Sequence, residues 1–303
     1  MKIYVGVTDK GWYEQLMAQN PDEVNFWKPG STNFRVLEPN DLFLFKLHHP
    51  YNCIVGGGFF VRFSLLPPFL AWKAFGLNNG TRTYDELLAR INKYRTQNRI
   101  TDTNNSIGCI VLTEPFFLSE NQCIAAPPDW KPSIVQGKTY DMSTEIGADL
   151  YRQVMESTQR VASIGTLEVG PRYAVSTTLH RLGQGAFRVV VTEAYQRRCS
   201  ITGEKTLPVL EAAHIKPYSE DGPHDIKNGL LLRSDFHTLF DDGYITVNKD
   251  FVIEISRKLN QDYGNGKDYY QYHGSRLQHL PTRANELPLS EYIEWHNDHC
   301  YRG

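Results

Sequence analysis

Three features are scarce in this sequence: long apolar runs, an excess of charge of one sign, and paired cysteines. The apolar stretch around residues 59–66 is far shorter than the roughly 18 residues that a membrane helix needs. Lysine and arginine total 32 against 34 acidic residues, a formal net charge of -2, which excludes a generally basic nucleic-acid coat. Any contact with nucleic acid must therefore be local.

The five cysteines are an odd number, and no two of them form a CxxC pair. This pattern favours reduced thiols over a disulfide framework. The first residues read as a strand and lack the apolar stretch of a secretory signal. We therefore expect a soluble, cytoplasmic protein that does not contact a membrane.

The length of 303 residues allows two domains, and the character of the sequence changes near residue 170. Residues 41–47 and 53–61 predict two strands joined by a turn, and three successive glycines at 56–58 indicate a bulge or a close backbone approach. Residues 83–94 have helical spacing and open with Thr83 and Glu86, as in a capping box. Residues 107–112 and 116–118 predict separate strands on either side of Pro115.

Further helices are predicted at residues 142–159 and 185–198, with a linker between them at 166–178. The sequence therefore predicts an α+β protein with one domain at residues 1–165 and a second at 179–303.

The densest pattern lies in residues 199–247. His214 precedes Ile-Lys-Pro, Asn228 precedes Gly-Leu-Leu-Leu, and His237 precedes Thr-Leu-Phe-Asp. The spacings are 14 and 9 residues. This arrangement resembles the HNH nuclease family, whose ββα-metal fold implies a histidine on one strand, an asparagine in the returning strand and a histidine on the next helix.

The chemistry of these residues agrees with that resemblance. Phosphodiester hydrolysis needs a base to activate water and a cation to stabilise developing charge. His214 is the candidate base, because a neutral imidazole accepts a proton near pH 7. The amide of Asn228 could hold the hairpin together, orient His214 or approach the metal.

A divalent ion, Mg²⁺ or Mn²⁺ or another transition metal, is the implied cofactor. His237 and Asp241 are four residues apart on a predicted helix and could bind it together. Many relatives have an acidic residue or a histidine immediately before the base, where this chain has Ala213. Glu211 or water could complete the ligands instead. Many relatives also carry two CxxC pairs that bind structural zinc, of which only Cys199 is present here, so the resemblance implies no structural zinc in this chain. His224 is expected to be solvated in a loop.

Basic and amide side chains around the motif could bind phosphate and position a duplex. The candidate DNA-binding residues are Arg181, Gln184, Arg188, Arg197, Arg198 and Lys216.

The first domain resembles the PUA-like superfamily, which includes the SRA, EVE and ASCH domains. The resemblance rests on the Pro-Asn-Asp turn at residues 39–41, the strand that follows it, and the Ile-Val-Gly strand at 54–56. It implies a small β-barrel with helices, and several relatives hold a modified base in an aromatic pocket. The candidate pocket residues are Trp12, Asn25, Phe26, Trp27, His48 and Trp72.

Together these features predict an endonuclease that restricts double-stranded DNA carrying modified cytosine. Cutting both strands with one site per chain implies a homodimer or two successive nicks. One alternative is an HNH effector whose first domain senses a nucleotide signal or a protein. Another is a DNA-binding protein whose nuclease has decayed, for which Ala213 would be the sign. RNA is the less favoured substrate.

Overall fold

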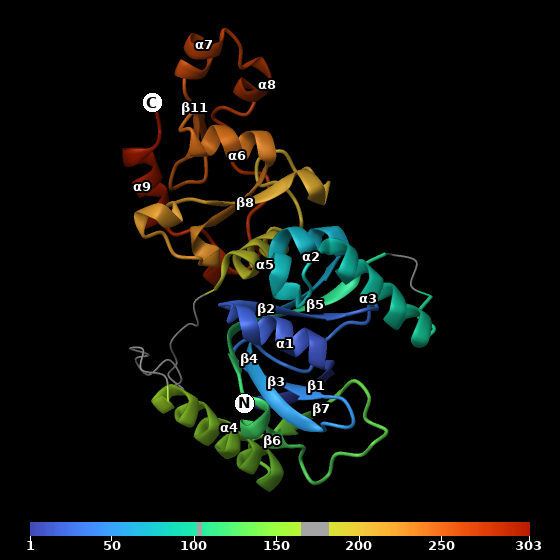
Figure 1. Ribbon diagram of the computed structural model, residues 1–303. Helices are drawn as coiled ribbons and strands as arrows, with labels where there is room; N and C mark the ends of the chain where they lie inside the picture. Colours follow the sequence, from blue (N-terminus) through green and yellow to red (C-terminus); the bar gives the residue numbers. More distant parts are fainter. Residues whose placement is uncertain (102–104, 165–181) are drawn as a thin grey trace. The chain divides into compact units, whose positions relative to one another are not determined.

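The computed structural model describes residues 1–101, 105–164 and 182–303. The chain divides into two compact units, Met1–Ala186 and Phe187–Gly303. Both units combine helices with sheets, so the α+β prediction is confirmed (Figure 1). The predicted linker at 166–178 falls outside the described residues.

The first unit is built on a seven-stranded sheet with the strand order β2-β5-β4-β3-β1-β7, to which β6 adds by pairing with β4. Strands β1 and β3 are parallel, and the other pairs are antiparallel. The elements are β1 (Lys2–Thr8), α1 (Lys10–Gln19), β2 (Glu23–Lys28), β3 (Leu42–Leu47), β4 (Cys53–Leu66), α2 (Pro68–Phe75), α3 (Tyr84–Gln97), β5 (Ile107–Phe117), β6 (Ile124–Ala125), β7 (Gly137–Asp141) and α4 (Glu145–Ile164).

The sheet separates two apolar clusters. One cluster collects aromatic side chains from β2, β3 and β4 beneath α1, and Trp12 lies at its centre with its ring about perpendicular to Phe26 and Phe45. The other cluster lies on the opposite face and includes Leu150 and Val154 of α4. Successive residues of a strand therefore contribute to opposite cores, as Phe43 and Leu44 of β3 do, in keeping with the period of two.

The three-glycine segment of β4 fits closely between its neighbours, as predicted. A side chain at Gly56 would meet the backbone oxygen of Phe116, and one at Gly57 would meet the backbone oxygen of Phe43. Gly56 also has a φ of 154°, a value that favours glycine. The long strand can therefore bend where it pairs with β3 and β5.

The prediction of two strands around Pro115 is wrong, because β5 runs without interruption from Ile107 to Phe117. Glu114 adopts a φ of 47°, and the pairing with β4 shifts between Gly57 and Phe59. The proline therefore lies in a bulge, where its missing N–H does not break the ladder.

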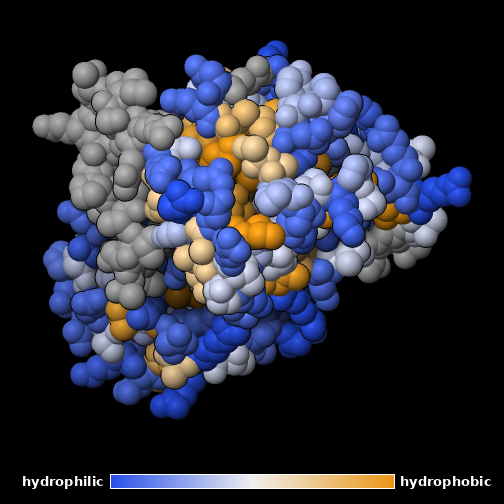
Figure 2. Space-filling view, turned by 90° about the horizontal axis from the view of Figure 1, so that it is seen from below, coloured by the Kyte–Doolittle hydropathy of each residue, from blue (hydrophilic) through white to orange (hydrophobic). Residues whose placement is uncertain are grey.

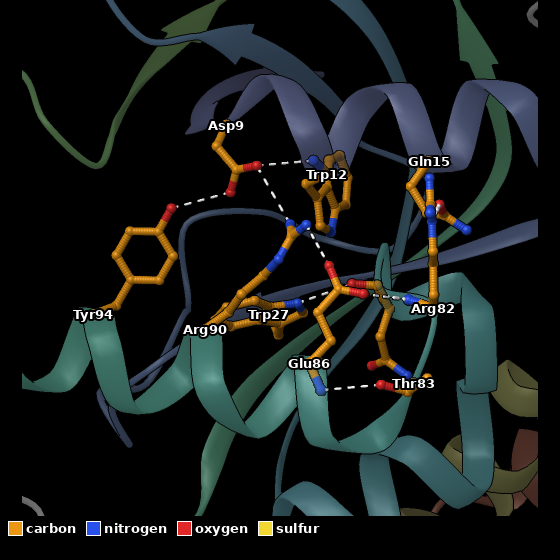
Figure 3. A network of polar contacts seen from close by, with 10 residues as sticks. Asp9, Trp12, Gln15, Trp27, Arg82, Thr83, Glu86, Arg90 and Tyr94 are labelled. Carbon is orange, nitrogen blue, oxygen red and sulfur yellow. Dashed lines mark hydrogen bonds and ion pairs between the residues drawn. The ribbon is translucent and has the colours of Figure 1, made fainter.

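Helix α3 begins as predicted. The hydroxyl of Thr83 accepts a hydrogen bond from the backbone N–H of Glu86 at 3.2 Å. The Glu86 carboxylate accepts from the backbone N–H of Arg82 and pairs with Arg90 (Figure 3). Asp9 then joins two helices, because it caps α1 at Trp12 and also accepts hydrogen bonds from the α3 side chains of Arg90 and Tyr94 (Figure 3).

The second unit contains two small sheets and several short helices around one core. Its elements are α5 (Gln184–Ala194), which begins just before the boundary, β8 (Leu210–His214), β9 (Gly229–Arg233), α6 (Ser234–Asp241), β10 (Ile245–Val247), β11 (Ile253–Ile255), α7 (Lys258–Tyr263), α8 (Lys267–Tyr270) and α9 (Ser290–His299). Helix α5 is shorter than predicted, because Gln196 and Arg197 have φ values of 49° and 59°, which end a right-handed helix.

Figure 2 shows a face that is mainly hydrophilic, on which apolar side chains gather in patches. Among the described residues, no helix combines the length and the apolar character needed to span a bilayer.

Candidate active site

The motif residues lie on a β-hairpin and the helix that follows it. Strands β8 and β9 are antiparallel, with His214 opposite Gly229, and α6 begins immediately after β9. Leu230, Leu231 and Leu232 are completely buried, as are Phe236 and, nearly, Phe240 of α6. This apolar packing fixes the helix against the hairpin, in the ββα order that the motif implies.

His214 ends β8 and is held on one side by an aromatic ring. Its imidazole stacks on Phe187 of α5, with ring centroids 4.0 Å apart and an angle of 12° between the planes. Burial, together with the nearby His224 and His237, lowers the pKa of His214 to about 4. The imidazole is therefore neutral at pH 7 and able to accept a proton.

His224 contacts His214 directly, contrary to the expectation of a solvated loop residue. Its Nδ1 lies 2.9 Å from Nε2 of His214, and its ring stacks on Tyr218 at 4.4 Å. The ten-residue separation does not reveal this contact, because it depends on how the loop between β8 and β9 folds back. The signals in the sequence were the two prolines, Pro217 and Pro223, which restrict that loop.

Asn228 closes the same loop from its base. The side chain is completely buried, and Oδ1 accepts from the backbone N–H of Lys216 at 2.8 Å. Nδ2 donates to the carbonyls of Lys216 and Pro223 at 2.9 and 3.0 Å. The amide thus joins both ends of the segment that carries His214 and His224. It lies in the 3-10 turn Ile226–Asn228, one residue before the returning strand.

His237 on α6 lies between two carboxylates. Its Nδ1 is 2.8 Å from Glu211 Oε2 on β8, and its Nε2 is 3.3 Å from Asp241 Oδ2 on the next turn of α6. Burial raises the pKa of Asp241, while the charge of His237 opposes that rise. The predicted metal-binding residues are therefore neighbours in space.

The geometry divides these three residues into two roles. A hydrogen bond from Nδ1–H to Glu211 leaves the Nε2 lone pair of His237 directed toward Asp241. An imidazole nitrogen and a carboxylate oxygen about 3 Å apart can bind one cation at about 2.1 Å. Glu211 would orient the imidazole. Among residues 1–101, 105–164 and 182–303, no three His, Cys, Asp or Glu side chains are arranged as a metal cluster.

The residue before the candidate base supplies no ligand. Ala213 is completely buried in the core of the second unit. Its methyl group packs with apolar side chains, so water or substrate would have to complete the coordination of an ion at His237 and Asp241.

The candidate DNA-binding residues lie in several places. Arg188 of α5 is half-buried beside β8, where its guanidinium donates to the carbonyl of Leu210, and burial lowers its pKa while Glu211 opposes that effect. Arg197 pairs with Glu193 at 2.6 Å. Lys216 lies over the ring of Trp295.

The remaining candidates are more peripheral. Gln184 is exposed at the start of α5. Burial lowers the pKa of His279, and the nearby positive charge of Arg198 lowers it further. Arg181 falls outside the described residues.

The six candidate pocket residues of the first unit do not form one cage. Trp12 and Phe26 are buried in the aromatic cluster under α1. Asn25 and Trp27 both donate to Asn79, at its side chain and its carbonyl respectively. His48 is exposed at the end of β3, and Trp72 is half-buried beside Tyr84.

Comparisons with known proteins agree with the motif. The HNH endonuclease family matches residues 199–248. None of the curated proteins matches this chain. Among solved structures, ASCH from Zymomonas mobilis is similar with 9% identity and a TM-score of 0.30, covering 54% of this chain and 94% of its own. The modification-dependent TagI restriction endonuclease has 13% identity and a TM-score of 0.28, covering 93% of this chain and 76% of its own.

The family match spans β8, β9 and α6, which carry His214, Asn228 and His237 in the ββα order. The second unit of this protein therefore contains an HNH endonuclease domain at residues 199–248, and the protein is a nuclease.

Proposed function

We propose that the protein is a divalent-metal-dependent endonuclease that cuts double-stranded DNA carrying modified cytosine. The observation that carries the nuclease chemistry is the placement of a neutral, partly buried His214 on the same ββα unit as His237 and Asp241. We also propose that it acts in the cytoplasm, where its five free cysteines would stay reduced.

In this proposal, His214 is the general base. It removes a proton from water, the oxygen of that water attacks phosphorus, and the bond to the leaving nucleotide oxygen breaks. His237 and Asp241 would hold the divalent ion, and Glu211 would orient His237. When bound, such an ion would stabilise the charge that develops on the phosphate and on the leaving oxygen. Asn228 positions the loop that carries the base.

Positive side chains beside the site would hold the phosphate backbone. Arg188 and Lys216 are nearest to the catalytic elements in the fold, since Arg188 contacts Leu210 of β8 and Lys216 follows His214 by two residues. Phosphate contacts position a duplex without reading its sequence. A choice among DNA molecules would then depend on another part of the protein, and we assign it to the first unit.

The proposed reader is the first unit, through an aromatic surface that takes up a base extruded from the duplex. Trp12, Phe26 and Trp27 are buried, so base uptake by these residues would require a local opening. His48 and Trp72 are accessible without such a change. These two residues are therefore the first to substitute when modification dependence is tested.

Cleavage of one plasmid in three forms tests the proposal. The plasmid is prepared unmodified, 5-methylated or 5-hydroxymethylated at cytosine, and each form is treated with wild type or His214→Ala in Mg²⁺ or Mn²⁺. We expect cutting of a modified form only, loss of cutting with a chelator, and loss in the variant. Equal cutting of all three forms would refute modified-base reading, while leaving the nuclease chemistry intact.

The dependence of the cleavage rate on protein concentration tests the proposed homodimer. If two chains act together, linear product forms without accumulation of nicked circles, and its rate rises more steeply than the first power of protein concentration. Two independent nicks by one chain would instead give a nicked intermediate and a first-order dependence.

A further inference from the structure

Four aromatic rings form a row from the core of the second unit to its surface. Phe187 stacks on His214, His214 meets His224 through a 2.9 Å contact between ring nitrogens, and His224 stacks on Tyr218. The planes of His224 and Tyr218 differ by only 7°, and Tyr218 is 66% exposed. Each histidine is thus held by one aromatic face, and the two are joined edge to edge.

The contact between the histidines requires a single shared proton, because a hydrogen bond needs one donor and one acceptor. In one arrangement, His214 donates from Nε2–H and His224 accepts at Nδ1. In the other, His224 donates from Nδ1–H, and His214 carries its own proton on Nδ1. Only the first arrangement leaves His214 a lone pair, at Nδ1, with which to accept a proton from water.

Two considerations favour the first arrangement. Neutral histidine in water prefers the tautomer with its proton on Nε2, and the first arrangement places both residues in that preferred tautomer. Among the described residues, the His214 ring has a hydrogen-bond contact at Nε2 and none at Nδ1, so a proton on Nδ1 would lack an acceptor in the protein. Burial lowers the pKa of His224 as well, which keeps the accepting ring neutral.

We propose that His224 is a positioning residue for the nuclease reaction, which accepts the Nε2 proton of His214 and thereby fixes Nδ1 of His214 as the atom that deprotonates the attacking water. The inference rests on the proposed role of His214 as the base. During the step, the water proton moves to Nδ1, the water oxygen bonds to phosphorus, and the bond to the leaving oxygen breaks. His214 becomes an imidazolium whose Nε2–H remains bonded to His224.

The role of Tyr218 follows from the same geometry. His224 lies in a loop, and its ring would otherwise rotate freely about the side-chain bonds. Stacking on Tyr218 restricts that rotation and keeps Nδ1 directed at His214. Asn228 also restricts the position of His224, because its side chain donates to the carbonyl of Pro223, the residue before His224.

Two substitutions at His224 separate the acceptor from the ring. His224→Phe keeps a ring that can stack on Tyr218 but removes the acceptor. His224→Asn keeps an acceptor oxygen near the position of Nδ1 but removes the ring. The matched control is His299→Phe, because His299 is likewise a histidine stacked on an aromatic ring, that of Trp295, and it lies exposed at the end of α9.

Single-turnover cleavage of plasmid DNA with bound metal ion is the activity readout. We expect the single-turnover rate constant of His224→Phe at saturating protein to fall by about 10²-fold, the lower end of what general-base catalysis supplies, with little change in the protein concentration that gives half the maximal rate. His224→Asn should recover most of that loss, and His299→Phe should behave as wild type. A His224→Phe rate within about threefold of wild type would overturn the proposal, as would an Asn variant no more active than the Phe variant.

The tautomer itself is measurable in the wild-type protein, so the test does not depend on a variant that folds. Long-range proton–nitrogen NMR of protein labelled with ¹⁵N-histidine, near pH 7, distinguishes Nε2–H from Nδ1–H at His214. We expect Nε2–H in the wild type and a mixture in His224→Phe. Nδ1–H in the wild type would overturn the proposal. Full activity of His214→Ala would instead refute the proposed base, whatever tautomer is found.

Discussion

At the scale of single residues, the site depends on polar groups that are satisfied while buried. Asn228 makes three hydrogen bonds to the backbone of one loop, at Lys216 and at Pro223. The proposed catalytic histidine is therefore positioned by a buried amide that takes no part in proton transfer.

Substituting Asn228 with aspartate tests that role. The carboxylate would place an oxygen against the carbonyls of Lys216 and Pro223 and lose both donors, leaving buried groups unpaired. We expect Asn228→Asp to lower the unfolding free energy by about 3 kcal/mol, measured by urea denaturation. Asn98→Asp is the control, since the side chain of Asn98 is exposed where it donates to the carbonyl of Tyr94, and it should change stability by less than about 0.5 kcal/mol.

The buried His296 predicts a pH dependence of stability. Its imidazole contacts Thr246 and the carbonyl of Phe240, and burial lowers its pKa to about 4. The unfolded chain binds a proton at this residue below about pH 6.5, whereas the folded protein does so only near pH 4. Protons therefore favour the unfolded chain in this window, and stability is lost as the pH falls through it.

The size of this effect is accessible from urea denaturation at two pH values. Lowering the pH from 7 to 5 should cost about 2 kcal/mol of unfolding free energy through His296. In His296→Gln, which should be less stable at both pH values, the pH-dependent loss should be smaller by that amount. An equal loss in both proteins would contradict the assignment.

At the scale of elements, the first unit depends on close contact between strands at the three glycines of β4. Gly56 has both a positive φ and the backbone oxygen of Phe116 beside it. We expect Gly56→Ala to destabilise the protein by about 3 kcal/mol or more, since overpacking adds to backbone strain.

Gly76 provides a matched comparison for that substitution. It has φ and ψ of 48° and -121° and no atom within 4 Å of an added side chain, so Gly76→Ala should cost only the backbone strain, on the order of 1 to 2 kcal/mol. Thermal unfolding of both variants separates the two contributions. Equal destabilisation would show that the contact with Phe116 contributes nothing.

Some strands, helices and contacts of this protein could be predicted from the sequence, and others could not. The HNH order placed His214 on a strand and His237 on a helix, as observed, because spacing along strands and helices follows fixed periods. Asn228 lies instead in a turn, one residue before the strand in which the resemblance implied it. The prediction of two strands on either side of Pro115 was wrong, because a bulge at Glu114 accommodates the proline within one strand. His224 was missed because ring contacts across a loop have no sequence period.

The aromatic residues of the first unit illustrate a second limit. Composition could not distinguish Trp12 and Phe26, which pack in the core, from the accessible His48 and Trp72. Burial depends on which face of a strand or helix each side chain occupies, and that is set by the register of the sheet.

At the scale of the whole molecule, a net charge of -2 implies that DNA binding depends on few positive groups. We expect Lys216→Ala to weaken DNA binding and to lower the slope of log K against log salt by about 1, which corresponds to one phosphate contact. Arg197→Ala should change the slope less, because Glu193 already offsets that charge. Fluorescence anisotropy across a salt series, without metal ion to prevent cutting, measures both.

The central claim is that an HNH endonuclease domain uses His214 to activate water. Single-turnover conversion of supercoiled plasmid by wild type and His214→Ala, with DNA binding measured in parallel, tests it most directly. We predict a variant that binds DNA like wild type and cuts at least about 10²-fold more slowly, the range expected for loss of a general base. A variant that binds and cuts as fast as wild type would contradict the account.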